Sequence, residues 1–205
     1  MNQRLFVALG ATLILLAACS KETNSTAGQP DTETTGTVQA ASETTTASAT
    51  TTGSMGGTAT NMTAEDKEFV SRAGMGGLAE VQMGNLALQK ASSADVKAFG
   101  QRMVTDHSKA NEELSQLATA KGLALPTELA GEHKEAFDHL NSLSGADFDK
   151  MYMQHMVEDH VKDVSEFEKA STSAQDSDVK GWAGKTLPTL QQHLQVAKEV
   201  NGKVK

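Results

Sequence analysis

Apolar residues recur in steps of three and four along four long segments of the chain, and this periodicity restricts its fold more than any other feature. Such spacing gathers apolar side chains on one face of an α-helix. Strand-like alternation is absent, and only 4% of the residues are aromatic. Thr63–Asp66, Ser92–Asp95 and Ser144–Asp147 each resemble a capping box, and Asp176 or Ser177 begins the last segment. Four long helices with short loops predict an all-α, antiparallel four-helix bundle over residues 63–205.

Breaks in the pattern predict where the helices end. The second long helix is expected to stop at Lys121–Gly122, and the last at Asn201–Gly202. A short extra helix over Thr127–Asn141 is expected in the connection between the second and third long helices. Methionines at helical spacing are expected to fill the core rather than to bind copper.

Each long helix carries one titratable residue within its apolar stripe. These four residues are Glu80, His107, His160 and His193. They lie near the middle of their helices, and mid-helix positions share a level in an antiparallel bundle. Because a buried charge without a partner is costly, the sequence allows two explanations for the cluster. It forms hydrogen bonds within itself, or it binds a metal ion.

Asp106 and Asp159 each precede one of these histidines, about 100° around the helix. They are therefore either carboxylates that orient a histidine of a neighbouring helix, or solvated acids on the flank of the bundle. The other histidines lie off the stripes and are expected at the surface: His133, His139 and His155.

The first helix is unusually rich in glycine, with Gly74, Gly76, Gly77 and Gly84. Each costs about 1 kcal/mol relative to alanine inside a helix. The glycines indicate either very close packing of two helices or room for a ligand beside Glu80.

The first 18 residues have the pattern of a lipoprotein signal peptide. An apolar run from Leu5 to Ala18 is too short to span a bilayer and has the length of a secretory signal. It ends in Leu-Ala-Ala-Cys, which resembles the bacterial lipobox. That resemblance implies lipidation of Cys19, a stable membrane anchor and, with Ser20 following, sorting to the outer membrane on its periplasmic side. Residues 19–62 are rich in Thr, Ser and Gly without an apolar period, and predict a disordered tether.

Two internal matches indicate a duplication. FGQRMVTDHSKANEEL matches YMQHMVEDHVKDVSEF, and a second register pairs Glu80 with Asp159 and Asp95–Phe99 with Asp178–Trp182. The second register superimposes the first two long helices on the last two. Two related hairpins around a central site follow the plan of ferritin-like proteins.

The stretches GGLAEVQMGNLALQKA, VKAFGQRMVTDHSKAN, FDKMYMQHMVEDHVKDV and LPTLQQHLQVA resemble a bacterial family of secreted proteins and lipoproteins defined by a domain of unknown function. The resemblance implies a ferritin-like four-helix bundle, with Glu80, His107, His160 and His193 at positions that the family pattern marks. The Glu-x-x-His pairs of di-iron sites are missing, which argues against iron storage or ferroxidase activity.

One Glu and three His suit a single divalent transition metal, with Zn, Fe, Mn or Cu as the candidates. One hypothesis is therefore a membrane-tethered periplasmic lipoprotein of unestablished biochemical role with a metal site in its bundle. One alternative is a non-catalytic envelope or partner-binding protein whose cluster is a buried polar network, and another is a redox enzyme. No catalytic residue and no particular protein partner is predicted. A net charge of −8 argues against nucleic acid as a partner.

Overall fold

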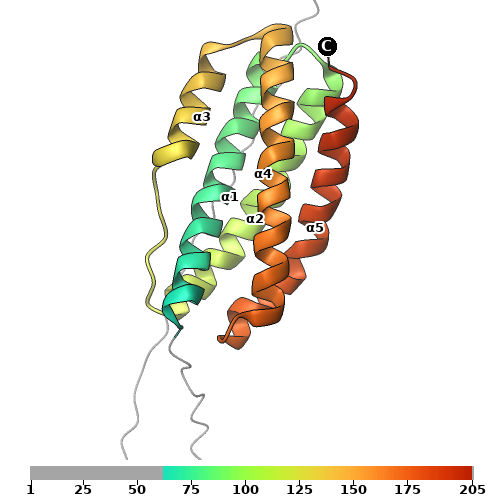
Figure 1. Cartoon of the computed structure of the whole chain (residues 1–205). Helices are drawn as coiled ribbons and strands as arrows, with labels where there is room; N and C mark the ends of the chain where they lie inside the picture. Colours follow the sequence, from blue (N-terminus) through green and yellow to red (C-terminus); the bar gives the residue numbers. More distant parts are fainter. Residues whose placement is uncertain (1–61, 205) are drawn as a thin grey trace, which may run out of the picture. The chain divides into compact units, whose positions relative to one another are not determined.

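The structure, a computed structural model, describes residues 62–204. This part of the chain forms five α-helices: α1 (Ala64–Lys90), α2 (Ala94–Ala120), α3 (Gly131–Ser142), α4 (Gly145–Ser173) and α5 (Ser177–Asn201) (Figure 1). It contains no strand, which confirms the all-α expectation. None of these helices is long and apolar enough to cross a bilayer. The predicted signal peptide, Cys19 and the tether up to residue 61 lie outside the described residues.

The helices pack as two hairpins. α1 lies against α2, and α4 lies against α5, each pair joined by a short turn. Contacts of α1 with α4 and of α2 with α5 close the four long helices around a shared interior. α3 lies outside this interior, against α1 and α4 (Figure 1). It begins at Gly131 rather than at the predicted Thr127. The residues between are not helical, and among them Leu129 packs against the core.

The capping box predicted at the start of α1 is present. Thr63 Oγ1 accepts a hydrogen bond from the Asp66 amide at 3.1 Å, and Asp66 accepts one from the Thr63 amide at 3.3 Å. The buried Asp66 carboxylate also accepts the amides of Gln175 and Asp176, at 3.2 and 3.1 Å. The start of α1 therefore holds the turn that connects α4 to α5.

The capping box predicted at Ser92–Asp95 is wrong. Ser93 is the N-cap of α2, but its side chain makes no capping hydrogen bond. Asp149 of α4 takes that part instead, accepting the amides of Ser92 and Ser93 at 3.0 and 2.8 Å and the Ser92 hydroxyl. Ser144 likewise caps α4 without a side-chain hydrogen bond, whereas Asp176 caps α5 through two amides, as expected.

The two hairpins thus cap each other reciprocally: an aspartate of each accepts the two amides at the turn of the other. Corresponding residues of the two halves differ by a constant offset in residue number. This offset pairs Asp66 with Asp149, Ser92 with Gln175, Ser93 with Asp176 and Asp95 with Asp178. The same offset pairs Glu80 with Asp163. The sequence comparison, which paired Glu80 with Asp159, had this part of the register wrong.

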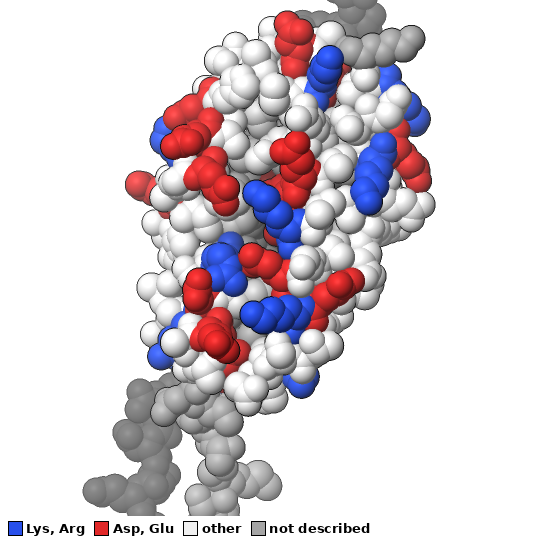
Figure 2. All heavy atoms as spheres, viewed as in Figure 1, with Lys and Arg blue, Asp and Glu red and all other residues white. Residues whose placement is uncertain are grey.

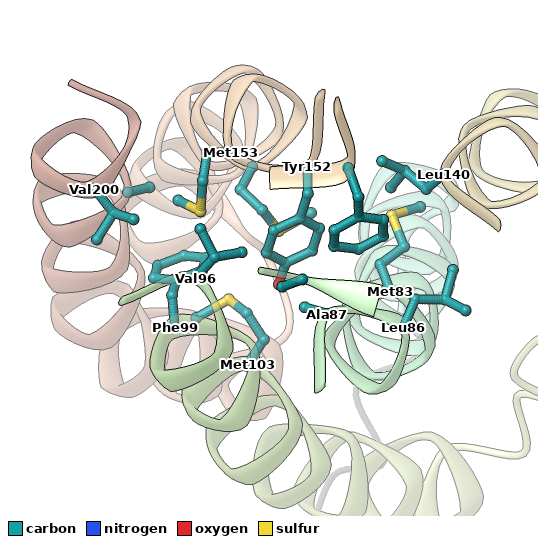
Figure 3. Packing of buried hydrophobic residues seen from close by; sticks show 14 of the residues in the cluster. Met83, Leu86, Ala87, Val96, Phe99, Met103, Leu140, Tyr152, Met153 and Val200 are labelled. Carbon is teal, nitrogen blue, oxygen red and sulfur yellow. The ribbon is translucent and has the colours of Figure 1, made fainter. Parts of the chain in front are cut away.

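Two hydrophobic clusters fill the interior. The first includes Met83, Met103, Met153 and Met156, all fully buried. Figure 3 shows Phe99 and Tyr152 among the first three of these methionines. These methionines are core residues, as expected. The second centres on aromatic rings, with Phe167 5.1 Å from Phe69 and 5.3 Å from Trp182 between ring centroids. Along α2, α4 and α5 the predicted histidine falls between the parts that enter these two clusters. On α1, Glu80 follows Ala79 at the edge of the first cluster.

The glycines of α1 allow close packing at one position and leave open space at another. A Cβ atom on Gly84 would lie 2.8 Å from the carbonyl oxygen of Gly100, so α1 and α2 approach closely there. A Cβ on Gly76 would meet no atom within 4 Å, which leaves space on the α1 surface one turn before Glu80.

Acidic and basic side chains are interspersed over the face shown in Figure 2. Several form ion pairs, such as Arg72 with Glu68 and Glu166, and Lys185 with Glu113. This face has no continuous basic stripe of the kind that binds nucleic acid. The absence of a nucleic-acid partner stays a prediction.

Candidate functional site

One side chain from each long helix meets the others between the two hydrophobic clusters. Glu80 comes from α1, His107 from α2, His160 from α4 and His193 from α5. Their exposed fractions are 1%, 6%, 0% and 1%. The three imidazole centroids lie between 5.2 and 5.8 Å apart. The four residues expected to share one level of the bundle therefore lie together.

Each of the three histidines has one ring nitrogen against a hydrogen-bond acceptor. His107 Nδ1 lies 2.7 Å from Glu80 Oε2, and His160 Nδ1 lies 2.9 Å from the carbonyl oxygen of Met156. His193 Nε2 lies 2.8 Å from Asp106 Oδ2. Because a neutral imidazole carries one N–H, these acceptors assign the proton to the nitrogen that faces them.

The opposite nitrogen of each ring is left with a lone pair. His107 Nε2, His160 Nε2 and His193 Nδ1 are all buried and make no hydrogen bond. One ring nitrogen from each histidine lies within 4.8 Å of the corresponding atoms of the other two. Buried polar atoms nearly always have a partner, so three unpartnered nitrogens in one place call for an explanation. A cation accounts for all three, because it accepts three lone pairs at once.

Burial also keeps these rings uncharged. Removal from water lowers the pKa of His107 and of His193 to about 4, despite the opposing charge of Asp106 beside each. It lowers the pKa of His160 as well, and the other two histidines add to that effect. Neutral imidazole is the form that binds metals, so the site needs no deprotonation of its histidines at neutral pH.

Glu80 is the carboxyl group of the cluster. Burial, with the nearby charge of Asp159, raises its pKa well above the usual range and favours the protonated form. Its Oε2 faces His107, and its Oε1 lies 3.3 Å from His160 Nε2. Neither Oε1 nor His160 Nε2 has a hydrogen-bond partner within the described residues, and the raised pKa favours a proton on the Glu80 carboxyl group. An incoming cation would displace that proton.

Asp106 and Asp159 differ in their placement. Asp106 lies on α2 and accepts from His193 of the neighbouring helix, with Arg102 3.8 Å away. It is therefore a carboxylate that orients a histidine and not merely a solvated acid. Asp159 is buried, and its charge acts on Glu80 and His107. Its Oδ2 has no hydrogen-bond partner among the described residues, so it orients no histidine of the cluster through that oxygen.

The expectation of surface histidines holds only for His139, which is exposed on α3. His133 and His155 are half-buried, and each has a buried ring nitrogen without a hydrogen-bond partner. Both are partly covered because α3 packs against this side of α4.

Asp163 is a member of the site that the sequence interpretation missed. It is half-buried on α4, and its carboxylate lies within 4.8 Å of a ligand atom of Glu80 and one of His160. It lies outside the narrow apolar stripe of its helix. Its pairing with Glu80 in the duplicated halves was the signal that would have found it.

A small cavity of about 20 Å³, enough for one water molecule, borders Glu80, His107 and Asp163. Gly76, Thr186 and Trp182 also line it. Larger hollows occur elsewhere, such as one of about 280 Å³ beside the start of α1, but they contain none of the histidines of the cluster.

Two solved structures share this fold. A fragment of a DUF305 protein from Deinococcus radiodurans matches with a TM-score of 0.61 and 12% identity, covering 69% of this chain and 98% of that one. CopM in its Cu(II)-bound form matches with a TM-score of 0.57 and 15% identity, covering 67% and 96%. At such identities the likeness concerns the fold alone, a helical bundle of the ferritin-like kind.

No protein of curated function matches the chain. A family of proteins defined by a domain of unknown function, DUF4142, matches residues 50–200. That match spans most of the chain, including all four residues of the buried cluster. The chain therefore belongs to the DUF4142 family.

Proposed function

We propose that this domain binds one divalent first-row transition metal ion through His107, His160 and His193. The observation that carries the proposal is the set of three buried, unpartnered ring nitrogens, one from each histidine. Each ring has its proton on the other side, held by an acceptor. Metal-binding histidines typically donate their second ring N–H to a carboxylate or a backbone carbonyl in this way.

The remaining residues orient these ligands. Asp106 holds His193 and the Met156 carbonyl holds His160. Glu80 Oε2 holds His107, while its Oε1 stays within reach of the centre. The carboxylate predicted as a fourth ligand thus acts in this proposal first as the partner of His107. Three imidazoles leave a coordination position free for water or a further ligand.

Imidazole nitrogen suits Zn, Cu, Fe and Ni, so the donor set does not select one metal. Cu(II) is the first ion to test, because a protein of similar fold has been solved in a Cu(II)-bound form. Zn, Fe and Mn complete the test.

The test is metal content and binding by the full-length protein purified without chelators. We expect one equivalent of metal, either retained or bound on titration, together with a raised melting temperature. His107→Ala and His193→Ala are expected to weaken binding at least about tenfold. His139→Ala removes an exposed histidine of the same chain and is the matched control.

The opposing result is equally clear. If the protein binds none of these ions and its melting temperature ignores them, the cluster is a buried polar network within a non-catalytic protein. The histidine variants would then lose stability without losing any ligand.

We also propose that the four long helices form the antiparallel arrangement of ferritin-like proteins, and that a lipid on Cys19 anchors the domain to the outer membrane on its periplasmic side. The Leu-Ala-Ala-Cys motif and the following Ser20 support the anchor. Cys19→Ser should move the protein from the membrane fraction to the soluble periplasmic fraction. A variant that stays with the membrane would contradict the anchor and leave the metal site untouched.

A further inference from the structure

Two groups of metal-binding side chains share one histidine. The inner site consists of His107, His160 and His193, and the outer site consists of Glu80, His160 and Asp163. In each group the ligand atoms lie within 4.8 Å of one another. His160 has only Nε2 to offer, because its Nδ1 is bonded to the Met156 carbonyl. One nitrogen binds one ion, so the two sites are alternative positions for a single ion.

The sites differ in access to solvent. Every residue of the inner site is buried, whereas Asp163 of the outer site is half-exposed. The small cavity beside Gly76 borders Asp163 and Glu80 of the outer site and His107 of the inner site. The cavity therefore adjoins both sites, and the outer site includes the one residue of the two groups that reaches solvent.

The sites differ in chemistry as well. The outer site has two carboxyl groups and one imidazole, and the inner site has three imidazoles. Carboxylate oxygens accept ions that still carry water, while imidazole binds first-row metals from Fe to Zn more firmly. Glu80 Oε1 is buried without a hydrogen-bond partner and lies 3.3 Å from His160 Nε2, so it is placed to share an ion with that nitrogen.

The duplication explains why two carboxyl groups face each other here. Glu80 and Asp163 occupy corresponding positions of the two hairpins, related by the same offset as the reciprocal caps. Each hairpin contributes one acid to the outer site.

We propose that the outer site is the loading position of the metal centre: a hydrated divalent cation first binds Asp163 and Glu80, and His160 then passes it to His107 and His193. This inference rests on the proposed function. Asp163 holds the ion only in transit, so it governs how fast the ion arrives and leaves, and not how tightly it is finally held.

Stopped-flow mixing of the full-length protein with Cu(II) tests this role. Trp182 is the single tryptophan of the chain and lines the cavity, so quenching of its fluorescence reports arrival of the ion. Dissociation is followed by adding a chelator. Glu158→Gln, an exposed acid on the same helix, is the matched control for Asp163→Asn.

We expect Asp163→Asn to slow both association and dissociation at least about tenfold, with the Kd unchanged within about twofold. Glu158→Gln should match the wild type. Gly76→Leu, which fills open space at the cavity without removing a charge, should slow both rates in the same way. Circular dichroism and the melting temperature verify that each variant is folded.

Two results would overturn the loading position while leaving the inner site intact. One is unchanged rates in Asp163→Asn. The other is a weaker Kd caused by faster dissociation, which would make Asp163 a ligand of the final centre. A wild-type protein that binds no ion defeats the proposed function itself, and the inference with it.

Discussion

At the scale of single residues, the site depends on which nitrogen of each histidine carries its proton. Asp106, Glu80 and the Met156 carbonyl make that choice from outside the three rings. The result is one buried, unpartnered nitrogen on each of three rings that lie together in one cluster. A change at an orienting residue should therefore alter binding without removing a ligand.

Asp106→Ala is the sharpest test of this idea. Without its acceptor, His193 can place its proton on Nδ1, the nitrogen needed for the ion. We expect metal affinity to fall about 10- to 100-fold, measured by competition with a chelator of known affinity. Glu112→Ala, an exposed acid on the same helix, should leave affinity unchanged. Equal affinities in both variants would contradict the orienting role.

Helical periodicity alone brought Glu80, His107, His160 and His193 together, because a polar residue within an apolar stripe must point inward. It did not separate the ligands from the residue that orients one of them. That distinction depends on acceptors from other helices, such as Asp106 for His193. Asp163 was missed because it lies beside the stripe rather than in it.

At the scale of elements, the two reciprocal caps fix how the hairpins meet. Asp149 is buried and accepts two amides and a hydroxyl at the start of α2. Asp66 does the corresponding work at the turn before α5. The amides of Ser92 and Ser93 in one turn, and of Gln175 and Asp176 in the other, therefore depend on an acceptor from the opposite hairpin.

Asp149→Ala should therefore cost more than the loss of an ordinary cap. We expect the free energy of unfolding to fall by about 2 kcal/mol, since two part-buried amides and a hydroxyl lose the acceptor that a buried carboxylate provides. Asp147→Ala, an exposed acid in the first turn of the same helix, should cost only about 0.5 kcal/mol. Urea denaturation measures both, and similar losses would show that Asp149 is not a special contact.

The limits of sequence interpretation are visible in the same contacts. The start of α1, the end of α2 and both ends of α5 follow from local signals, such as the Thr63 capping box and the glycine after α2, Gly122, which has a positive φ. The cap of α2 comes instead from Asp149, more than fifty positions away along the chain. The residues next to Ser92 and Ser93 in the sequence contain no signal for this contact.

At the scale of the whole molecule, the buried cluster makes stability depend on pH. The pKa values of His107 and His193 are about 4 when folded, against an ordinary value of 6.5. The stability that these neutral histidines contribute is fully present above pH 6.5. It is lost as the pH falls toward 4, because the unfolded chain takes up protons that the folded protein does not bind. The lowered pKa of His160 acts in the same direction.

Glu80 acts in the opposite direction. Its pKa is raised from 4.5 in the folded protein, so its contribution is present below pH 4.5 and declines as the pH rises. The pKa of Asp163 is raised as well, by burial and by the nearby charge of Glu80, so Asp163 acts in the same direction as Glu80. The three histidines outweigh these two carboxyl groups between pH 4.5 and 6.5. Above pH 6.5 the two carboxyl groups still differ between the folded and unfolded states.

The metal-free protein should therefore be most stable near pH 6.5 and lose stability on both sides. Denaturant unfolding with a chelator present, repeated from pH 4 to 9, measures this profile. Glu80→Gln should weaken the decline on the alkaline side, leaving the part that Asp163 causes, and keep the one on the acidic side. A wild-type profile that is flat between pH 4.5 and 6.5 would contradict the neutral, buried histidines.

The reciprocal caps also bear on how such a chain can arise. A single hairpin that carried one aspartate and one exposed pair of turn amides would already fit a second copy of itself across a twofold axis. Joining two copies through a connection such as the one that includes α3 would free each half to change. One half now has Glu80 where the other has Asp163, and His107 and His193 no longer occupy corresponding positions. The chain has the construction of a covalent dimer, and under the two proposals above its asymmetry provides two unequal places for an ion.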